Sequence, residues 1–181
     1  MDGWPGMTAS VHFRTGQDEW PTPRWAFEML DGEFGFDIDL CASPANALRP
    51  VYYTREQDAL SRGWWLDGQS GYCNPPYSRA AGGIGAFLAK GREAAANGMT
   101  VVFLIPARPD TGWWAEHVMQ ADEVRLLQGR LKFGDGTGNA PFPSCIVVYR
   151  PVQRYTVGSV TYTLTPTVRP VFTCLSRERM T

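Results

Sequence analysis

One short stretch combines side chains and backbone groups that can hold a planar amino group. Residues 71–78 read Gly-Tyr-Cys-Asn-Pro-Pro-Tyr-Ser. Pro75 and Pro76 each fix φ near about −65° and lack a backbone donor, so the chain must turn there. Asn74 Oδ1 and the Pro75 carbonyl can then accept the two hydrogens of an amino group, while the Tyr77 ring covers the molecule's face. The stretch predicts a turn that binds a flat amino-bearing molecule, and an ordinary proline turn is the alternative.

An acidic residue ends the first predicted strand, well before this turn. Residues 34–40 alternate apolar with polar or small side chains, which predicts a strand ending near Asp39. The small residues Cys41 and Ala42 follow and would let a ligand approach the backbone. An acid in this place often opens the ligand crevice of an α/β sheet, where Asp39 could receive an ammonium group. A strand-end turn acid is the alternative, and the glycines of a dinucleotide fingerprint are missing.

A second acidic position follows the short strand predicted at residues 51–54. An acid just past a second strand commonly binds ribose hydroxyls, so either Glu56 or Asp58 qualifies. Asp58 is equally well explained as a simple helix cap.

The composition is that of an ordinary globular protein. The 181 residues fit one domain, with 44% hydrophobic and 19% charged side chains. We expect a cytoplasmic protein without a membrane segment, because no stretch approaches 18 apolar residues and the N-terminus lacks a signal-peptide pattern. Four cysteines without CxxC spacing and two histidines make a metal site improbable, so no metal is predicted.

Helices and strands alternate along the chain. Thr22 suits a helix N-cap and Pro23 the first helical position. The remaining apolar patterns predict helices at 23–30, 79–97 and 110–119, the last capped by Asp110, and strands at 70–73, 100–106, 123–127 and 145–149.

This alternation predicts an α/β fold with an open, mostly parallel sheet. The last two strands lack a helix between them and are expected to form an antiparallel hairpin at the end of the sheet. We expect a flexible arm at residues 1–17, one main domain at 18–150 and a C-terminal hairpin or tail at 151–181.

The net charge of −1 conceals an asymmetry. Residues 1–124 carry 9 basic and 16 acidic side chains, whereas residues 125–181 carry 8 basic and 2 acidic ones. A basic C-terminal third can contact phosphates, and a solvated surface without a polyanionic partner is the alternative.

Seven blocks of this sequence, spread over residues 17–150, resemble the phage DNA N6-adenine methyltransferase family, a compact Dam-type group. Asn-Pro-Pro-Tyr is the signature of methyltransferases that methylate planar amino nitrogens, and the other blocks occur in the order expected of the family. The blocks are WPTP (20–23), FGFDIDLCASPANA (34–47), YYTREQDAL (52–60), GYCNPPYS (71–78), VVFLIPARPDTGWW (101–114), GRLKFG (129–134) and APFPSCIVVYR (140–150).

The resemblance implies a Rossmann-like methyltransferase fold and transfer of methyl from S-adenosylmethionine to adenine N6 in DNA. Asn74, Pro75, Pro76 and Tyr77 would form the catalytic turn. The residues implied at the cofactor are Trp20, Thr22, Pro23, Asp39, Cys41, Ala42, Asp58 and Asn74. Those expected at DNA are Arg125, Arg130, Lys132 and Arg150 for phosphates, with Phe133 or Phe142 flanking the target base.

Other acceptors fit the same turn. Cytosine N4 presents the same type of amino group, and a glutamine amide of a protein has similar geometry. A non-catalytic module that binds S-adenosylmethionine or DNA is a third alternative. The basic C-terminal third favours DNA as the partner. The recognition sequence, the preference for single or double strands and the oligomeric state stay open.

Overall fold

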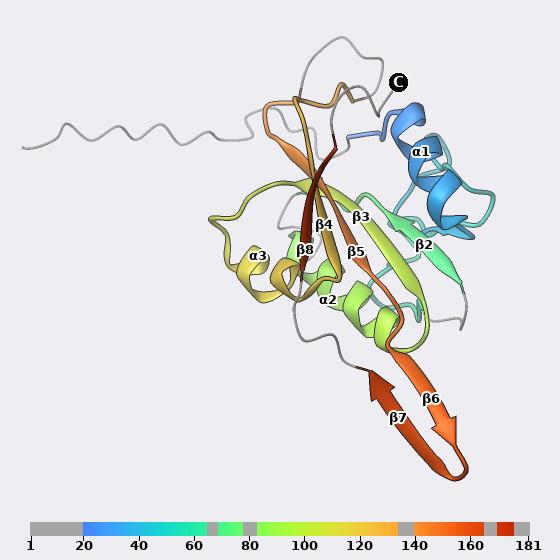
Figure 1. Cartoon of the computed structure of the whole chain (residues 1–181). Coiled ribbons are helices and arrows are strands. Elements are labelled where there is room, and N and C mark those ends of the chain that lie inside the picture. The colour runs from blue at the N-terminus through green and yellow to red at the C-terminus, as the bar shows by residue number, and fades with distance from the viewer. Residues whose placement is uncertain (1–19, 65–68, 78–82, 134–139, 165–169, 176–181) are drawn as a thin grey trace, which may run out of the picture.

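A six-stranded sheet forms the centre of the protein (Figure 1). The computed structural model describes residues 20–64, 69–77, 83–133, 140–164 and 170–175. The strand order is β1-β2-β3-β5-β4-β8, in which β1, β2 and β3 are mutually parallel, β5 is antiparallel to both of its neighbours, and β4 is parallel to β8. The strands are β1 (Ile38–Asp39), β2 (Ser70–Cys73), β3 (Thr100–Pro106), β4 (Glu123–Leu127), β5 (Ser144–Tyr149) and β8 (Val171–Leu175).

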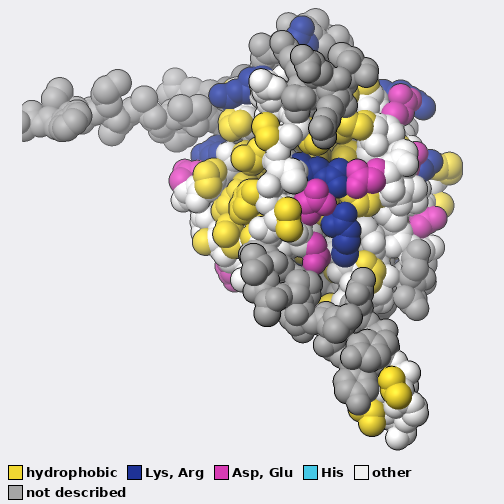
Figure 2. Space-filling view, viewed as in Figure 1, with side chains coloured by type: hydrophobic (Ala, Val, Ile, Leu, Met, Phe, Trp, Pro, Cys, Tyr) yellow, Lys and Arg dark blue, Asp and Glu magenta, His cyan; other side chains and the backbone are white. Residues whose placement is uncertain are grey.

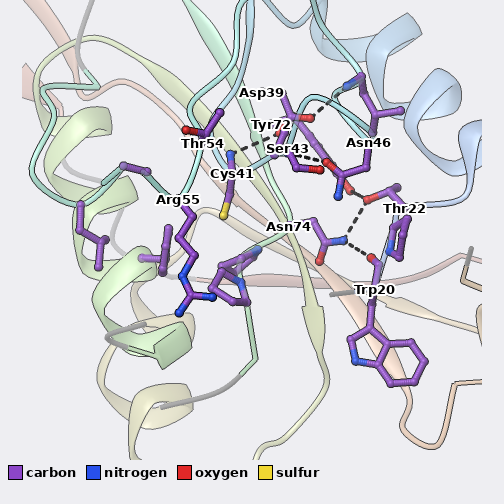
Figure 3. A pocket seen from close by; sticks show the side chains of 18 of the residues that line it. Trp20, Thr22, Asp39, Cys41, Ser43, Asn46, Thr54, Arg55, Tyr72 and Asn74 are labelled. Atoms are coloured by element: carbon purple, nitrogen blue, oxygen red, sulfur yellow. Dashed lines mark hydrogen bonds between the residues drawn. The ribbon is translucent and has the colours of Figure 1, made fainter. Parts of the chain in front are cut away.

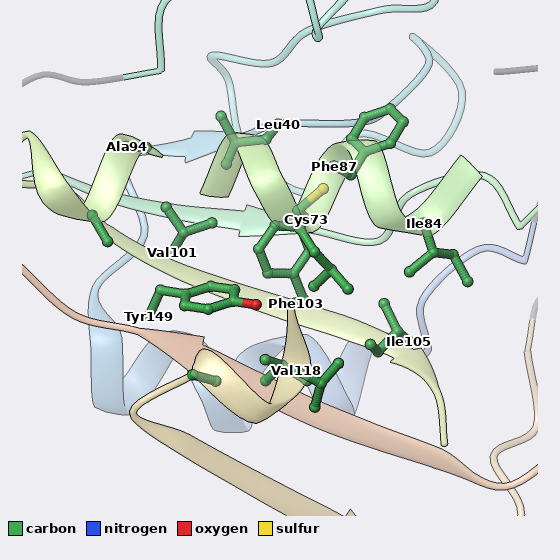
Figure 4. Close-up of a cluster of buried hydrophobic side chains, with 14 of the residues drawn as sticks. Leu40, Cys73, Ile84, Phe87, Ala94, Val101, Phe103, Ile105, Val118 and Tyr149 are labelled. Carbon is green, nitrogen blue, oxygen red and sulfur yellow. The ribbon is translucent and has the colours of Figure 1, made fainter. Parts of the chain in front are cut away.

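Helices cover both faces of the sheet, because the strands are apolar on both sides. Even-numbered positions of β3 pack with α1 (Arg24–Phe34), and odd-numbered positions pack with α2 (Gly83–Ala96) and α3 (Gly112–Glu116). Figure 4 shows the second of these clusters, with Phe103 and Tyr149 of the sheet beneath the helical residues Ile84 and Phe87.

Helix α2 approaches the sheet closely at a glycine. A Cβ atom built on Gly91 would lie 2.4 Å from the Phe103 ring. The absence of a side chain therefore permits the helix to rest directly on β3. Helix α2 carries the chain away from the proline turn, and β3, parallel to β2, returns it toward the same edge of the sheet.

The predicted mostly parallel α/β sheet is confirmed, but the position of its antiparallel strand was predicted wrongly. β4 and β5 do pair antiparallel, yet β5 lies between β3 and β4 and not at the end of the sheet. The edge is β8, which the sequence did not predict. A separate small hairpin of β6 (Gln153–Val157) and β7 (Val160–Leu164) extends from the sheet (Figure 1). Residues 153–164 thus form a hairpin, whereas residues 171–175 of the same C-terminal segment join the central sheet as β8.

The first two predicted strands are shorter than expected. β1 contains two residues, because Phe34 belongs to α1, Gly35 caps that helix, and residues 36, 37 and 40 lie outside the strand. The strand predicted at 51–54 is reduced to a single parallel bridge between Asp39 and Tyr52. The strands at 70–73, 100–106 and 123–127 have the predicted bounds, and β5 begins one residue earlier than predicted.

The predicted helices need larger corrections at their ends. α1 continues through Gly32 and ends at Gly35, whose φ of 58° supplies the left-handed turn. Its N-cap position is Pro23 and not Thr22. The segment predicted as one helix at 110–119 is split into α3 and η2 (Val118–Gln120), with Thr111 at the N-cap in place of Asp110. The predicted arm at 1–17 and the start of the helix at 79–82 lie outside the described residues.

Candidate active site

A pocket lies at the carboxyl ends of β1 and β2. Asp39 is the last residue of β1, Asn74 directly follows β2, and the two strands run parallel, so both side chains reach the same edge of the sheet. The cavity measures about 430 Å³ and is shown in Figure 3. Its lining consists of Trp20, Pro21, Thr22, Asp39, Cys41, Ala42, Ser43, Asn46, Leu48, Thr54, Arg55, Asp58, Ala59, Leu60, Tyr72, Asn74, Pro75, Pro76 and Phe87.

The Asn74 carboxamide is held in one orientation. Its Nδ2 donates to the Trp20 carbonyl at 2.6 Å and to Thr22 Oγ1 at 3.0 Å. A flipped amide would turn Oδ1 toward the Trp20 carbonyl, which can only accept, so this partner fixes which atom is oxygen. Both amide hydrogens are used, and Oδ1 points away from these partners in Figure 3.

Tyr77 contacts the other end of the same amide. Its hydroxyl donates to Asn74 Oδ1 at 3.0 Å, and its ring packs edge-on against Phe142 with centroids 5.4 Å apart. Burial raises the pKa of Tyr77 well above its ordinary value, so the hydroxyl stays protonated and acts as a donor. Oδ1 has two lone pairs and can accept a second hydrogen bond beside that from Tyr77.

Asp39 shapes the loop that follows β1. The residue is 3% exposed, and its carboxylate accepts hydrogen bonds from the backbone N–H groups of Cys41 at 3.3 Å and Leu48 at 3.2 Å. Burial raises the pKa of Asp39, and the two backbone hydrogen bonds oppose that rise. The acid therefore closes a loop whose small residues Cys41, Ala42 and Ser43 line the pocket.

Most residues predicted at the cofactor meet in this pocket. Trp20, Thr22, Cys41 and Ala42 line it together with Asp39, Asp58 and Asn74, whereas Pro23 is buried at the N-cap of α1 and does not.

Of the two acids considered for ribose, Asp58 lines the pocket and Glu56 does not. Asp58 has φ of 48°, the one positive φ among the described non-glycine residues. A helix-capping role for Asp58 is not seen, since no described helix begins there. Left-handed backbone in a pocket wall is a form of strain that clusters at functional sites.

Several lining residues were missed from the sequence. Arg55 and Leu60 belong to the block 52–60 that was recognised as a unit, but nothing in their types pointed to a ligand. Phe87 was predicted only as part of an apolar helix face. Because it comes from α2, on the far side of the proline turn, its place in the pocket depends on how that helix packs.

The structure corrects the prediction for Arg125. Its side chain is 10% exposed and its guanidinium binds Glu33 at 2.5 and 2.6 Å and Glu123 at 2.7 Å. Arg150 also contacts Glu123, at 3.2 Å. A buried, fully paired guanidinium is not available for phosphate. Figure 2 shows basic side chains lying against acidic ones on this face.

Of the remaining residues predicted to contact DNA, two have exposed side chains and two have buried ones. Arg130 and Lys132 are exposed next to the buried Phe133. Phe133 and Phe142 are 6% and 4% exposed and each packs edge-on against Trp20 at 5.5 Å. Neither ring presents an open face, so both support the Trp20 segment that holds Asn74.

Two kinds of feature are absent from the part of the chain that the structure describes. Within these ranges no group of three or more His, Cys, Asp or Glu side chains could hold a metal ion. The helices among them are all too short or too polar to cross a membrane.

The sheet and the pocket at its carboxyl edge define an α/β protein whose cavity lies where such sheets place their ligand sites. A family model described as DNA N-6-adenine-methyltransferase (Dam) matches residues 10–167. The chain belongs to this family of DNA adenine-N6 methyltransferases, as the resemblance predicted.

Two relatives carry the same description. The DNA N-6-adenine-methyltransferase of Haemophilus phage HP1 is 30% identical over 159 residues, covering 82% of this chain and 88% of that protein. The DNA N-6-adenine-methyltransferase of Escherichia phage T1 is 32% identical over 116 residues, covering 64% of this chain. This match spans 47% of the phage T1 protein, so about half of the phage T1 protein lies outside the aligned region.

Proposed function

We propose that this chain transfers a methyl group from S-adenosylmethionine to the N6 amino group of adenine in DNA, within a Rossmann-like methyltransferase fold. The observation that carries the proposal is the orientation of Asn74. Both hydrogens of its carboxamide are bound by Trp20 and Thr22, so Oδ1, which accepts from the Tyr77 hydroxyl, keeps a lone pair for a second donor, and the Pro75 carbonyl is the next acceptor along the chain. Two adjacent acceptors match the two hydrogens of an aromatic amino group.

The pocket residues fit the cofactor that the family implies. A cavity of about 430 Å³ lies in the range of small-molecule sites. Asp39 and Asp58 supply carboxylates for ammonium and ribose hydroxyls, and Leu60 and Phe87 supply apolar surface. When bound, S-adenosylmethionine supplies an electrophilic methyl group on sulfonium sulfur.

The protein's part in the reaction is to position and polarise the amino nitrogen. The lone pair of an adenine amino group is delocalised into the ring, which makes it a poor nucleophile. Hydrogen bonds from both hydrogens to Asn74 Oδ1 and the Pro75 carbonyl favour a more pyramidal nitrogen with a localised lone pair. Asn74 is a negligible base and Tyr77 stays protonated, so the proton leaves to solvent during or after transfer.

The target base must leave the duplex to enter such a pocket. A base inside the helix cannot reach the turn, so the proposal requires base flipping. Tyr77 is held by its hydrogen bond to Asn74 and by Phe142, and its ring replaces part of the lost stacking. The exposed Arg130 and Lys132 are the proposed phosphate contacts, and their contribution weakens as ionic strength rises. DNA as substrate and action in the cytoplasm of a bacterial host are parts of the same proposal.

The test is incubation of the purified chain with methyl-labelled S-adenosylmethionine and unmethylated DNA, followed by digestion to nucleosides. N6-methyladenine in the digest is the expected result, and mapping the modified positions would give the recognition sequence. Label on cytosine alone would contradict the adenine assignment and move the acceptor to N4. If DNA stays unlabelled while the cofactor binds, transfer to DNA is refuted, and glutamine-containing proteins are the next acceptors to test.

A further inference from the structure

Tyr72 lies two residues before Asn74, on the same side of β2 and its extension. Successive side chains of a strand alternate between faces, so Tyr72 points toward α1 while Cys73 points toward α2. The segment that precedes α1 crosses this side and brings Trp20 and Thr22 within hydrogen-bond distance of Asn74. Thr22 therefore lies between the two β2-derived side chains.

The Tyr72 hydroxyl is the polar end of an otherwise apolar buried side chain. The residue is 1% exposed, and its ring packs against Phe27 at 5.2 Å and Phe36 at 5.5 Å. Its hydroxyl oxygen is 2.7 Å from Thr22 Oγ1. Burial raises the pKa of Tyr72, so the group is neutral and protonated.

Thr22 connects Tyr72 to Asn74 through two hydrogen bonds. Asn74 Nδ2 can only donate, so Thr22 Oγ1 accepts from it. The same oxygen is bonded to the Tyr72 hydroxyl, whichever of the two hydroxyls is the donor. One threonine oxygen thus joins a rigid residue of the core to the carboxamide of the proposed catalytic turn (Figure 3).

We propose that Tyr72 is a positioning residue, which acts through Thr22 to hold Asn74 Oδ1 toward the amino group to be methylated. The inference rests on the proposed function, because it assigns Asn74 as the acceptor of that group's hydrogen. The Trp20 carbonyl decides which amide atom is oxygen, and the Thr22–Tyr72 pair fixes the plane of the amide by binding its second hydrogen. A phenylalanine at position 72 would keep the ring packing and the ring's place in the pocket lining, and would lose the hydroxyl that binds Thr22.

The chain offers a matched control in Tyr149. It is also 1% exposed, and its hydroxyl donates to the His117 carbonyl at 2.9 Å. Its ring belongs to the opposite cluster, on the α2 side of the sheet, and it does not line the pocket. Tyr149→Phe therefore removes an equally buried hydroxyl hydrogen bond away from Asn74.

The first experiment compares Tyr72→Phe with Tyr149→Phe at saturating DNA and cofactor. We expect kcat to fall about tenfold in Tyr72→Phe, as loss of one hydrogen bond that orients a reacting partner would produce, and to stay within about twofold in Tyr149→Phe. The KM for S-adenosylmethionine should stay within about twofold in both. Equal kcat in the two variants, with similar losses of thermal stability, would overturn the proposal.

Substitutions of Thr22 test the link itself. Thr22→Ser keeps the hydroxyl and should restore most of the rate that Thr22→Val loses. In the double variant Thr22→Val with Tyr72→Phe, the rate should equal that of Thr22→Val alone, since Tyr72 acts through the missing hydroxyl. A double variant whose loss is the product of the two single losses would contradict a path through Thr22.

A spectroscopic readout separates this proposal from the proposed function. The side-chain NH₂ resonances of Asn74, assigned with Asn74→Asp, should shift in Tyr72→Phe and Thr22→Val and stay fixed in Tyr149→Phe. If the parent chain methylates an acceptor other than adenine, the adenine assignment fails and the kinetic comparison is made on that acceptor. If it transfers no methyl, unmoved Asn74 resonances in Tyr72→Phe overturn the positioning role, and moved ones support it.

Discussion

Helix α1 is attached to the sheet at both ends, but by different chemistry. At its start, Thr22 and the Trp20 carbonyl bind Asn74 through neutral hydrogen bonds. At its end, Glu33 binds Arg125 of β4 in a charged cluster that also includes Glu123 and Arg150.

The two attachments differ in exposure and in what can perturb them. In the neutral network Thr22 and Asn74 are half-buried and Tyr72 is 1% exposed. The charged cluster joins the buried Arg125 to Glu33, whose side chain is 46% exposed. Neutral buried groups are insensitive to salt and pH, whereas partly exposed ion pairs respond to both. The comparison teaches that one helix can use separate interactions for two purposes: neutral hydrogen bonds at its start orient a side chain of the site, and ion pairs at its end stabilise the fold.

The largest expected effect comes from a substitution in the neutral hydrogen-bond network at the start of α1. Asn74→Ala removes an acceptor proposed to act in the transition state, so the methylation rate should fall at least about 100-fold. Cofactor binding should remain largely intact. Methyl transfer and equilibrium binding of S-adenosylmethionine measure the two quantities.

Asn74→Asp sharpens the same test. It keeps an acceptor but turns an oxygen toward the Trp20 carbonyl, so an activity between those of the parent and Asn74→Ala is expected. Full activity of Asn74→Ala would remove the proposed mechanism.

The second prediction concerns a substitution in the charged cluster at the end of α1. Arg125→Ala leaves two carboxylates without their shared cation and should lower the free energy of unfolding by about 2–3 kcal/mol, toward the low side for buried pairs because Glu33 is half-exposed. Urea unfolding measures the loss. At a temperature where the variant is folded, kcat should stay within a few-fold of the parent; a loss of rate as large as that of Asn74→Ala would show that the two ends are not separate.

The smallest expected effect concerns pH. The pKa of Glu123 is lowered from its ordinary value of 4.5, first by its hydrogen bond from Arg125. A group whose pKa is lower in the folded chain stabilises the fold above the unfolded pKa and loses that contribution as pH falls through the folded value.

The difference in unfolding free energy between the parent and Glu123→Gln should therefore be full at pH 7 and shrink as pH falls below about 4.5. Denaturant titrations of both proteins at pH 7 and at a pH below about 4.5 measure this difference. A difference that stays constant with pH would assign the stabilisation to packing and not to charge.

Local sequence patterns predicted the parts of the structure that depend on local sterics. The prolines at 75 and 76 required a turn, and the apolar run at 100–106 required a buried strand, because those constraints act within a few residues. The pocket residues Asp39, Cys41 and Ala42 were found in the same way, as an acid and small residues after a strand.

Helix ends were harder to predict because competing local signals had similar strength. The predicted helix ended at residue 30, shortly before Gly32, but α1 runs to Phe34 and is capped by Gly35, whose N–H donates to the Asp31 carbonyl at 2.8 Å. Each glycine alone is a plausible end. Packing of the last turn, with Glu33 on Arg125, favours the longer helix.

The sequence by itself determined the family, the proline turn and the acceptors that the turn offers, since these follow from residue types and their order. Only the tertiary structure decided how Asn74 is oriented, because its partner Trp20 is 54 positions away in the chain. It also assigned Arg125 to Glu33, 92 positions away, and not to a phosphate. A side chain's partners depend on which distant segments the sheet and helices bring together, and that information is absent from any local pattern.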